Sequence, residues 1–297
     1  MYKRKIDDGI FWFGGELFSF YAVCGERPAL IELGISQLAP MVADTFIEIA
    51  GAPPAILAAM HAHYDHAGGA ARLKSIFPEA KIAASAPAAA ALSCPTETRN
   101  ITCTLEALNG DPILSEKYPD ADREVVFGTV PVDMVLREGD VIDTGRERRG
   151  LLALMTPGHS ACSMSLFHQD TGALFVSDAC GMPLPSGRIW PTAFESFPDY
   201  LASLRRMLAL EPRYVCPAHF TFFREGRAVR FLEKSIQATE AFYENINGII
   251  DRVGPDTNAV LAELRETYDE AIRFIHPSLL RYGNRMMVRQ VIAERGG

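Results

Sequence analysis

The sequence predicts a mixed α/β (α+β) fold, arranged as a four-layer αββα sandwich with an added C-terminal helical segment. Short apolar runs, which are typical of strands, fall into two groups along the chain, and helical apolar spacing follows each group. A third observation is that polar residues able to bind a metal come directly after several of these runs. The length of 297 residues suits one large domain or a domain with appendages.

The first third of the chain predicts a β-meander and then alternating helices and strands. Gly14-Gly15 and residues 25–28 separate three short apolar runs, which we interpret as strands. The spacing of Met41, Phe46 and Ile49 predicts a helix, and Leu73, Ile76 and Phe77 predict another. The expected strands are 9–13, 18–23, 29–33, 55–60 and 81–85; the first of these helices is expected at 37–50, and one more helix is expected at 87–92.

Residues 93–131 interrupt this order, because their apolar periodicity weakens and their charge rises. Such a stretch inside a compact domain is a lid or a poorly ordered loop, and its place between core elements favours a lid. A second group of strands is expected after it. The predicted strands are 132–136, 151–155, 164–167, 173–177 and 214–216, with a helix at 199–210.

The last 70 residues carry helical patterns only. Val229, Leu232, Ile236, Phe242, Ile246 and Ile250 share one helical face, and two further amphipathic segments follow Gly254-Pro255 and Ser278. We therefore expect a catalytic domain at 1–227 and a helical extension at 228–297 that packs on the same domain. Its apolar faces would cover the rim of the active site or form a homodimer interface.

Composition excludes several classes of protein. No apolar run approaches the ~18 residues of a membrane helix, and the N-terminus has no signal-peptide pattern. A net charge of −8 argues against nucleic-acid binding, and six cysteines without a CxxC pair suit a cytoplasmic protein with reduced thiols. Residues 271–297 are nevertheless basic, so this end is a solvated helix face or meets an anionic substrate.

The segment His61-Ala62-His63-Tyr64-Asp65-His66 ends an apolar run and predicts a metal site. His61 and His63 point to the same side of an extended chain, and Asp65 and His66 follow where the chain turns. His159, Asp178 and His219 each end another apolar run, which completes a set for two metals. His168, before a hairpin turn, and His276, before a proline, are interpreted as structural.

This order of ligands resembles the metallo-β-lactamase-fold hydrolases over about residues 10–219. The resemblance implies that His61, His63 and His159 hold one metal, that Asp65, His66 and His219 hold the other, and that Asp178 bridges them. It also implies the αββα sandwich directly. The sequence around Glu32 and the segment 279–287 further resemble the quinolone-signal response thioesterases of this fold, whose C-terminal helices close over the pocket.

Histidines with a bridging carboxylate suit two divalent transition-metal ions, zinc or iron, with manganese also possible. Two such ions share a water and lower its pKa towards ~7, which gives a hydroxide nucleophile for a carbonyl group. We therefore expect a hydrolase acting on a small acyl thioester or a related ester, with Asp65 as the one evident general acid. A thiolate leaves without a proton, and the basic C-terminus could meet a coenzyme A phosphate.

Several alternatives stay open. An antibiotic-hydrolysing β-lactamase is disfavoured, because Asp178 stands where those zinc enzymes carry a cysteine ligand. A lactonase is disfavoured because Gly181 stands where such enzymes of this fold carry a tyrosine, but it remains a candidate together with a glyoxalase II-like hydrolase. The others are a mononuclear-iron persulfide dioxygenase and a regulatory protein with vestigial activity. Ser160, Ser177 and Cys180 are expected to be structural rather than nucleophilic.

Overall fold

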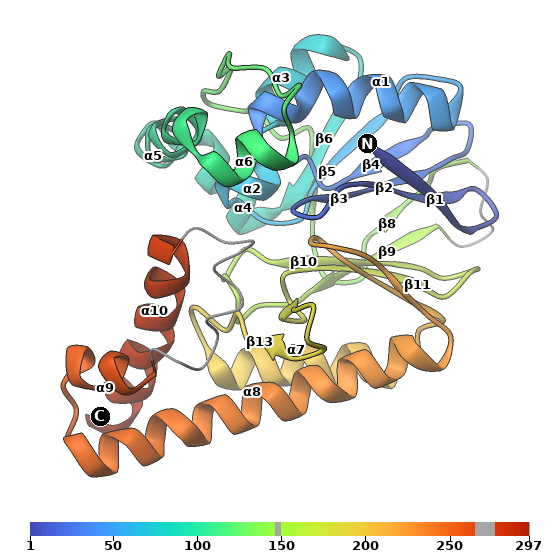
Figure 1. The fold of residues 1–297 in the computed structure, drawn as a ribbon. Coiled ribbons are helices and arrows are strands. Elements are labelled where there is room, and N and C mark those ends of the chain that lie inside the picture. The colour runs from blue at the N-terminus through green and yellow to red at the C-terminus, as the bar shows by residue number, and fades with distance from the viewer. Residues whose placement is uncertain (146–149, 265–276, 297) are drawn as a thin grey trace.

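The computed structural model describes residues 1–145, 150–264 and 277–296, and it shows four layers (Figure 1). Helices α1 (Ala39–Ala50) and α3 (Ala70–Ile76) cover the outer face of one sheet, and helices α7 (Phe197–Ala209) and α8 (Gly226–Val253) cover the outer face of the other. Three apolar clusters lie between the successive layers. The predicted αββα sandwich is confirmed.

The first sheet has the strand order β1-β2-β3-β4-β5-β6-β7. Its first four strands are antiparallel, and parallel pairing begins between β4 and β5. Side chains alternate between its faces: Phe20 and Ala22 join the cluster under the helices, whereas Tyr21 and Val23 face the other sheet. Its strands are β1 (Tyr2–Asp7), β2 (Ile10–Gly14), β3 (Ser19–Val23), β4 (Ala29–Ile31), β5 (Ile56–Ala59), β6 (Lys81–Ser85) and β7 (Met134–Leu136).

The second sheet has the order β15-β14-β11-β10-β9-β8, and only its pair β11–β14 is parallel. A separate two-stranded ribbon, β12–β13, lies between β11 and α7 in the chain. The strands are β8 (Val141–Ile142), β9 (Leu151–Met155), β10 (Met164–His168), β11 (Ala173–Ser177), β12 (Met182–Pro183), β13 (Ile189–Trp190), β14 (Tyr214–Pro217) and β15 (Phe223–Arg224).

Two expectations about strands were wrong. Residues 132–136 were assigned to the second group, but β7 pairs in parallel with β6 at the end of the first sheet. The Asp133 carboxylate accepts a hydrogen bond of 2.8 Å from the backbone N–H of Ile82, and this contact helps to fix that pairing. Strand β1 was not expected, because Lys3, Arg4 and Lys5 leave no apolar alternation on this exposed edge strand.

The segment 93–131 contains helices, which the sequence did not reveal. The buried positions Thr98, Ile101 and Leu105 have helical spacing, but Thr98 is polar, so the apolar residues alone do not show this pattern. Its helices, with the others on this side of the molecule, are α2 (Tyr64–Ala67), α4 (Ala86–Ser93), α5 (Pro95–Ala107) and α6 (Pro112–Lys117), with 3₁₀ turns at Ser36–Leu38 and Leu108–Gly110.

The C-terminal helices are α8, α9 (Thr257–Glu263) and α10 (Pro277–Gly296). Their apolar faces pack with α7 on the outer face of the second sheet, through residues such as Phe242, Ile246 and Met287. His276, which the sequence predicted to be structural, lies outside the described residues, as do the other residues of 265–276. Among the helices that the structure describes, none is both long and apolar enough to cross a bilayer.

Candidate metal centre

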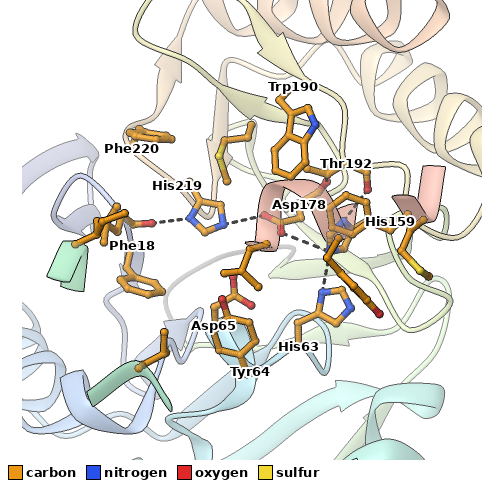
Figure 2. Close-up of a pocket in the computed structure, with 18 of the residues that line it drawn as sticks. Phe18, His63, Tyr64, Asp65, His159, Asp178, Trp190, Thr192, His219 and Phe220 are labelled. Carbon is orange, nitrogen blue, oxygen red and sulfur yellow. Dashed lines mark hydrogen bonds and ion pairs between the residues drawn. The ribbon is translucent and has the colours of Figure 1, made fainter. Parts of the chain in front are cut away.

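All seven predicted ligands converge between the two sheets, at the end where β5, β11 and β14 finish. They form three overlapping groups whose ligand atoms lie within 4.8 Å of one another. We call His61, His63 and His159 the first triad, and Asp65, His66 and His219 the second triad. Figure 2 shows His63, His159, Asp178 and His219 following one another across the centre.

The first triad consists of histidines that burial keeps neutral. The Nε2 atom of His159 lies 3.0 Å from the Nδ1 atom of His63. Burial lowers the pKa of His159 to about 4, and it also lowers the pKa of His63. Burial and the neighbouring histidines hold the pKa of His61 well below its usual value. Neutral imidazoles are the form that binds a metal.

The second triad is more strongly charged. The Nε2 atom of His66 lies 3.5 Å from a carboxylate oxygen of Asp65. Burial lowers the pKa of His66, but Asp178, Asp65 and Glu32 outweigh it and raise the pKa well above the usual value. The pKa of His219 is raised in the same way, since Asp178 outweighs burial. Burial opposes ionisation of Asp65, but His66 lowers the pKa of that carboxyl to about 2.

Asp178 lies between the two triads. One of its oxygens is 3.2 Å from Nε2 of His66 and 3.4 Å from Nε2 of His159, and the other is 3.3 Å from Nε2 of His219. Burial opposes its ionisation, but these three histidines hold the pKa of Asp178 well below its usual value. Its placement depends on a register shift between β11 and β14 and on a positive φ of 51° at Ser177. Such irregularities re-aim side chains next to functional sites.

Contacts outside the centre set the orientation of three imidazoles. The Nδ1–H group of His159 donates to the carbonyl of Thr192 at 2.7 Å, and that of His219 donates to the carbonyl of Leu17 at 2.6 Å. The Nδ1–H group of His66 donates to Glu32 at 2.9 Å. Because these acceptors are oxygens, Nδ1 carries a hydrogen in each ring, and Nε2 is the nitrogen that faces the centre. This is the arrangement of metal-ligating histidines.

The donor set fits divalent metal ions. Ligands about 2.0–2.1 Å from a tetrahedral ion lie roughly 3.3–3.4 Å from one another, and the contacts of Asp178 with the histidines match this spacing. The buried Nε2 atom of His61 has no hydrogen-bond partner among the residues that the structure describes. Both observations are expected of a site shaped around ions, because buried polar atoms are otherwise paired.

Several residues near the centre have structural partners instead. Ser160 lies 2.7 Å from Ser163, and Ser177 lies 3.3 Å from Nδ1 of His61. Burial raises the pKa of the Cys180 thiol well above its usual value, so this thiol is not a nucleophile. His168 contacts Thr171 in the turn between β10 and β11 at 3.0 Å, as expected for a structural histidine.

A cavity of about 360 Å³ opens onto the centre. His63, Asp65, His159, Asp178 and His219 form its polar end, and Tyr64 lies beside them (Figure 2). Apolar side chains from three separate regions form much of its walls. They are Leu108, Ile113 and Leu114 from the segment 93–131, Met182 and Trp190 from the β12–β13 ribbon, and Leu279, Tyr282 and Met286 from α10.

Sequence reasoning did not identify the individual residues of the pocket walls or the outer contacts of the ligands. Among the outer contacts, only Glu32 was indicated by the sequence, because the segment around it resembles that of related enzymes. The expected role of the basic C-terminus is also not seen, since none of Arg281, Arg285, Arg289 and Arg295 lines this cavity. Helix α10 presents apolar side chains to the cavity instead.

Comparison with known proteins places the chain in a family. Residues 44–219, more than half of the chain, match the metallo-beta-lactamase superfamily. Human acyl-coenzyme A thioesterase MBLAC2 is 25% identical over 254 residues, which cover 78% of this chain and 86% of that protein. The same-named protein of Gallus gallus is 26% identical over 265 residues, covering 78% of this chain and 85% of that one.

A solved structure agrees in fold over nearly the whole chain. A metallo-beta-lactamase family protein of Thermus thermophilus has a TM-score of 0.66 at 17% identity, and the match covers 98% of this chain and 95% of that one. The structural match and the histidine-aspartate clusters agree with the family match. The chain therefore belongs to the metallo-beta-lactamase superfamily, as a metal-dependent hydrolase.

Proposed function

We propose that the protein hydrolyses acyl thioesters at a dinuclear centre of zinc or iron, with manganese as a further candidate. The observation that carries this proposal is the meeting of seven metal-ligand side chains with an apolar cavity of about 360 Å³. The cavity suits an acyl chain whose carbonyl end reaches the ligands. The named activity of the MBLAC2 relatives, acyl-coenzyme A hydrolysis, supports the same substrate class.

In this proposal the first triad would hold one ion and the second triad would hold the other, with Asp178 as the carboxylate between them. Two divalent ions held in this way would supply a nucleophile from water at neutral pH and polarise the substrate carbonyl. The outer contacts of His66, His159 and His219 keep their Nε2 atoms turned inward.

The state of Asp65 favours a thioester over other acyl compounds. Its pKa of about 2 leaves a carboxylate, which accepts a proton but has none to give at neutral pH. An alkoxide or amine leaving group needs a proton donor, whereas a thiolate leaves without one because the pKa of a thiol is ~8.5. The Asp65 carboxylate can orient the attacking water by accepting its proton.

We also propose that residues 93–131 act as a lid and that the extension 228–297 forms part of the acyl pocket of the domain 1–227. Leu108, Leu114, Leu279 and Met286 line the cavity from these two segments. Met286→Ala is expected to shift the preferred acyl length upward, because it enlarges the wall without touching a ligand. Unchanged chain-length preference would count against this role for α10.

The proposed function is tested with a panel of substrates after metal loading. Acyl-coenzyme A, acyl-glutathione and lactone substrates are compared, together with measurement of metal per chain. Hydrolysis of thioesters with two metals per chain is the expected result. Turnover of lactones alone would favour the lactonase alternative, and one iron with sulfur-dependent oxygen uptake would favour the persulfide dioxygenase. An intact fold that binds a partner without turnover would favour the regulatory role.

A cytoplasmic location and a homodimer are further proposals. All six cysteines are free, which suits a reducing compartment.

A further inference from the structure

A second cavity, of about 510 Å³, lies beside the first and differs from it in charge. Arg188, Arg227, Arg230 and Lys234 line it, and no aspartate or glutamate is among its described lining residues. The cavity at the metal centre has the opposite character, because none of its described lining residues is lysine or arginine. We call the second cavity the cationic cavity.

The two cavities lie on either side of the β12–β13 ribbon and share one aromatic ring. Met182 pairs with Trp190 on the rung that lines the cavity at the metal centre. The neighbouring rung, Pro183 with Ile189, lines the cationic cavity, one residue or about 3.4 Å along the ribbon. Phe220 follows the ligand His219 directly and lines both cavities. Side chains of neighbouring rungs point to opposite faces of the ribbon, so the ribbon separates the two cavities, and a ligand that reached both would pass beside Phe220.

The cations of α8 are exposed and available to a ligand. Arg227, Arg230 and Lys234 are spaced by three and four residues on one helical face, and they form no ion pair with any residue that the structure describes. Glu225 and Glu233 are close to them in sequence, yet neither lines the cavity. This concentration of positive charge contrasts with the net charge of −8 of the whole chain.

The floor of the cationic cavity is aromatic. The rings of Phe223 and Phe231 stack at a centroid distance of 4.1 Å and an interplanar angle of 13°. Both line the cavity, Phe223 from β15 and Phe231 from α8. A third cavity, of about 390 Å³, shares Arg188 and Lys234 and extends the groove along α8. The space suits a ligand that carries both phosphates and a flat ring.

We propose that the cationic cavity binds the phosphorylated nucleotide part of the substrate's leaving group, so that the preferred thioester carries coenzyme A or a chemically similar thiol. This inference rests on the proposed thioesterase function. The acyl chain would occupy the apolar cavity, the thioester would lie at the metal centre, and the phosphates would meet Arg227, Arg230 and Lys234. The flat base would lie against the aromatic floor.

The experiment compares two thioesters with the same acyl group in the metal-loaded protein. One is an acyl-coenzyme A, and the other is the acyl-N-acetylcysteamine thioester, which lacks phosphates. Arg227→Ala/Arg230→Ala is expected to raise KM for the acyl-coenzyme A roughly ten- to a hundredfold with little change in kcat, because charge-assisted contacts are lost. The constants for the short thioester should stay unchanged.

The matched control is Lys81→Ala/Arg289→Ala, which removes two exposed cations that line none of these cavities. The KM and kcat for both substrates should stay unchanged in this control. A rise in KM for the acyl-coenzyme A as large as that of Arg227→Ala/Arg230→Ala would point to net charge alone and overturn the inference. Adenosine 3′,5′-bisphosphate is the second probe. It should compete with the acyl-coenzyme A but leave hydrolysis of the short thioester unchanged.

Two results would overturn the inference while leaving the proposed function intact. One is equal KM values of the wild-type protein for both thioesters. The other is inhibition of both substrates by the bisphosphate, which would make the cavity a site for a free nucleotide. Failure of the proposed function would appear differently, as absence of turnover of either thioester by the metal-loaded wild-type protein.

Discussion

The two triads share Asp178 but differ in charge and in their outer partners. The first triad contains histidines only, whose pKa values burial lowers, and His159 is held by a backbone carbonyl. The second triad contains the carboxylate of Asp65, and His66 donates to the buried Glu32. Extra negative charge stabilises protons and metal ions alike. The first and second triads should therefore bind metals with different dependence on pH and on their outer contacts.

The largest expected effect is that of Asp178→Ala, which removes the carboxylate that contacts histidines of both triads. We expect loss of one or both metals and a fall in kcat/KM of about a thousandfold or more, since the bridging charge holds the ions that carry the chemistry. Metal analysis of the purified variant, together with circular dichroism to check folding, measures this. Two metals per chain and normal rates would show that the site is assigned wrongly.

Replacing one ligand from each triad should separate the two positions. His63→Ala and His219→Ala are each expected to lower metal content by about one ion per chain, because each contacts only its own triad in the proposed assignment. Titration with Co²⁺, followed by its absorption spectrum, should give a different spectrum for each variant. Identical spectra with the same residual ion would mean that the triads do not act as separate sites.

Acidification should release the ion of the second triad first. The raised pKa values of His66 and His219 mean that protons compete for these nitrogens already at higher pH. The pKa of His159, about 4, leaves the first triad free of this competition until the pH approaches that value. Metal retained per chain after equilibration at falling pH should therefore drop in two steps. A single step would contradict the difference between the triads.

The smallest effect is expected from Glu32→Gln, which keeps the size of the side chain but removes its charge. The variant should bind the second ion about ten- to a hundredfold more weakly, as is typical when a contact to a ligating histidine is changed. Competition with a chelator measures the two affinities. Glu48→Gln, on the surface of α1, is the control. Weaker metal binding at the first triad instead would contradict the role assigned to Glu32.

Local patterns predicted much of the fold. Strands β6, β9 and β11 match the expected 81–85, 151–155 and 173–177, because their apolar runs are short, buried and bounded by polar or turn residues. Helices α7 and α8 were predicted from their apolar spacing. Predictions were wrong where the pairing partner lies far away in sequence. The apolar run of β7 correctly predicted a strand, but only pairing with β6 decides to which sheet this strand belongs.

The sequence by itself determined the type and order of the ligand side chains and their placement after apolar runs. This follows from local chemistry, since histidines and aspartates next to buried strands need a partner, and strand periodicity sets the side of the chain on which they lie. The tertiary structure decided what surrounds them. Glu32, Leu17 and Thr192 become partners of ligands only when the sheets pack.

The same distinction holds for the cationic cavity. The arginines of α8 have ordinary helical spacing, which predicts a solvated face and no more. The cavity exists because the β12–β13 ribbon and Phe220 lie against that face. The sequence thus determines the charge of the cationic cavity. Its shape depends on contacts between residues distant along the chain, which local periodicity cannot specify.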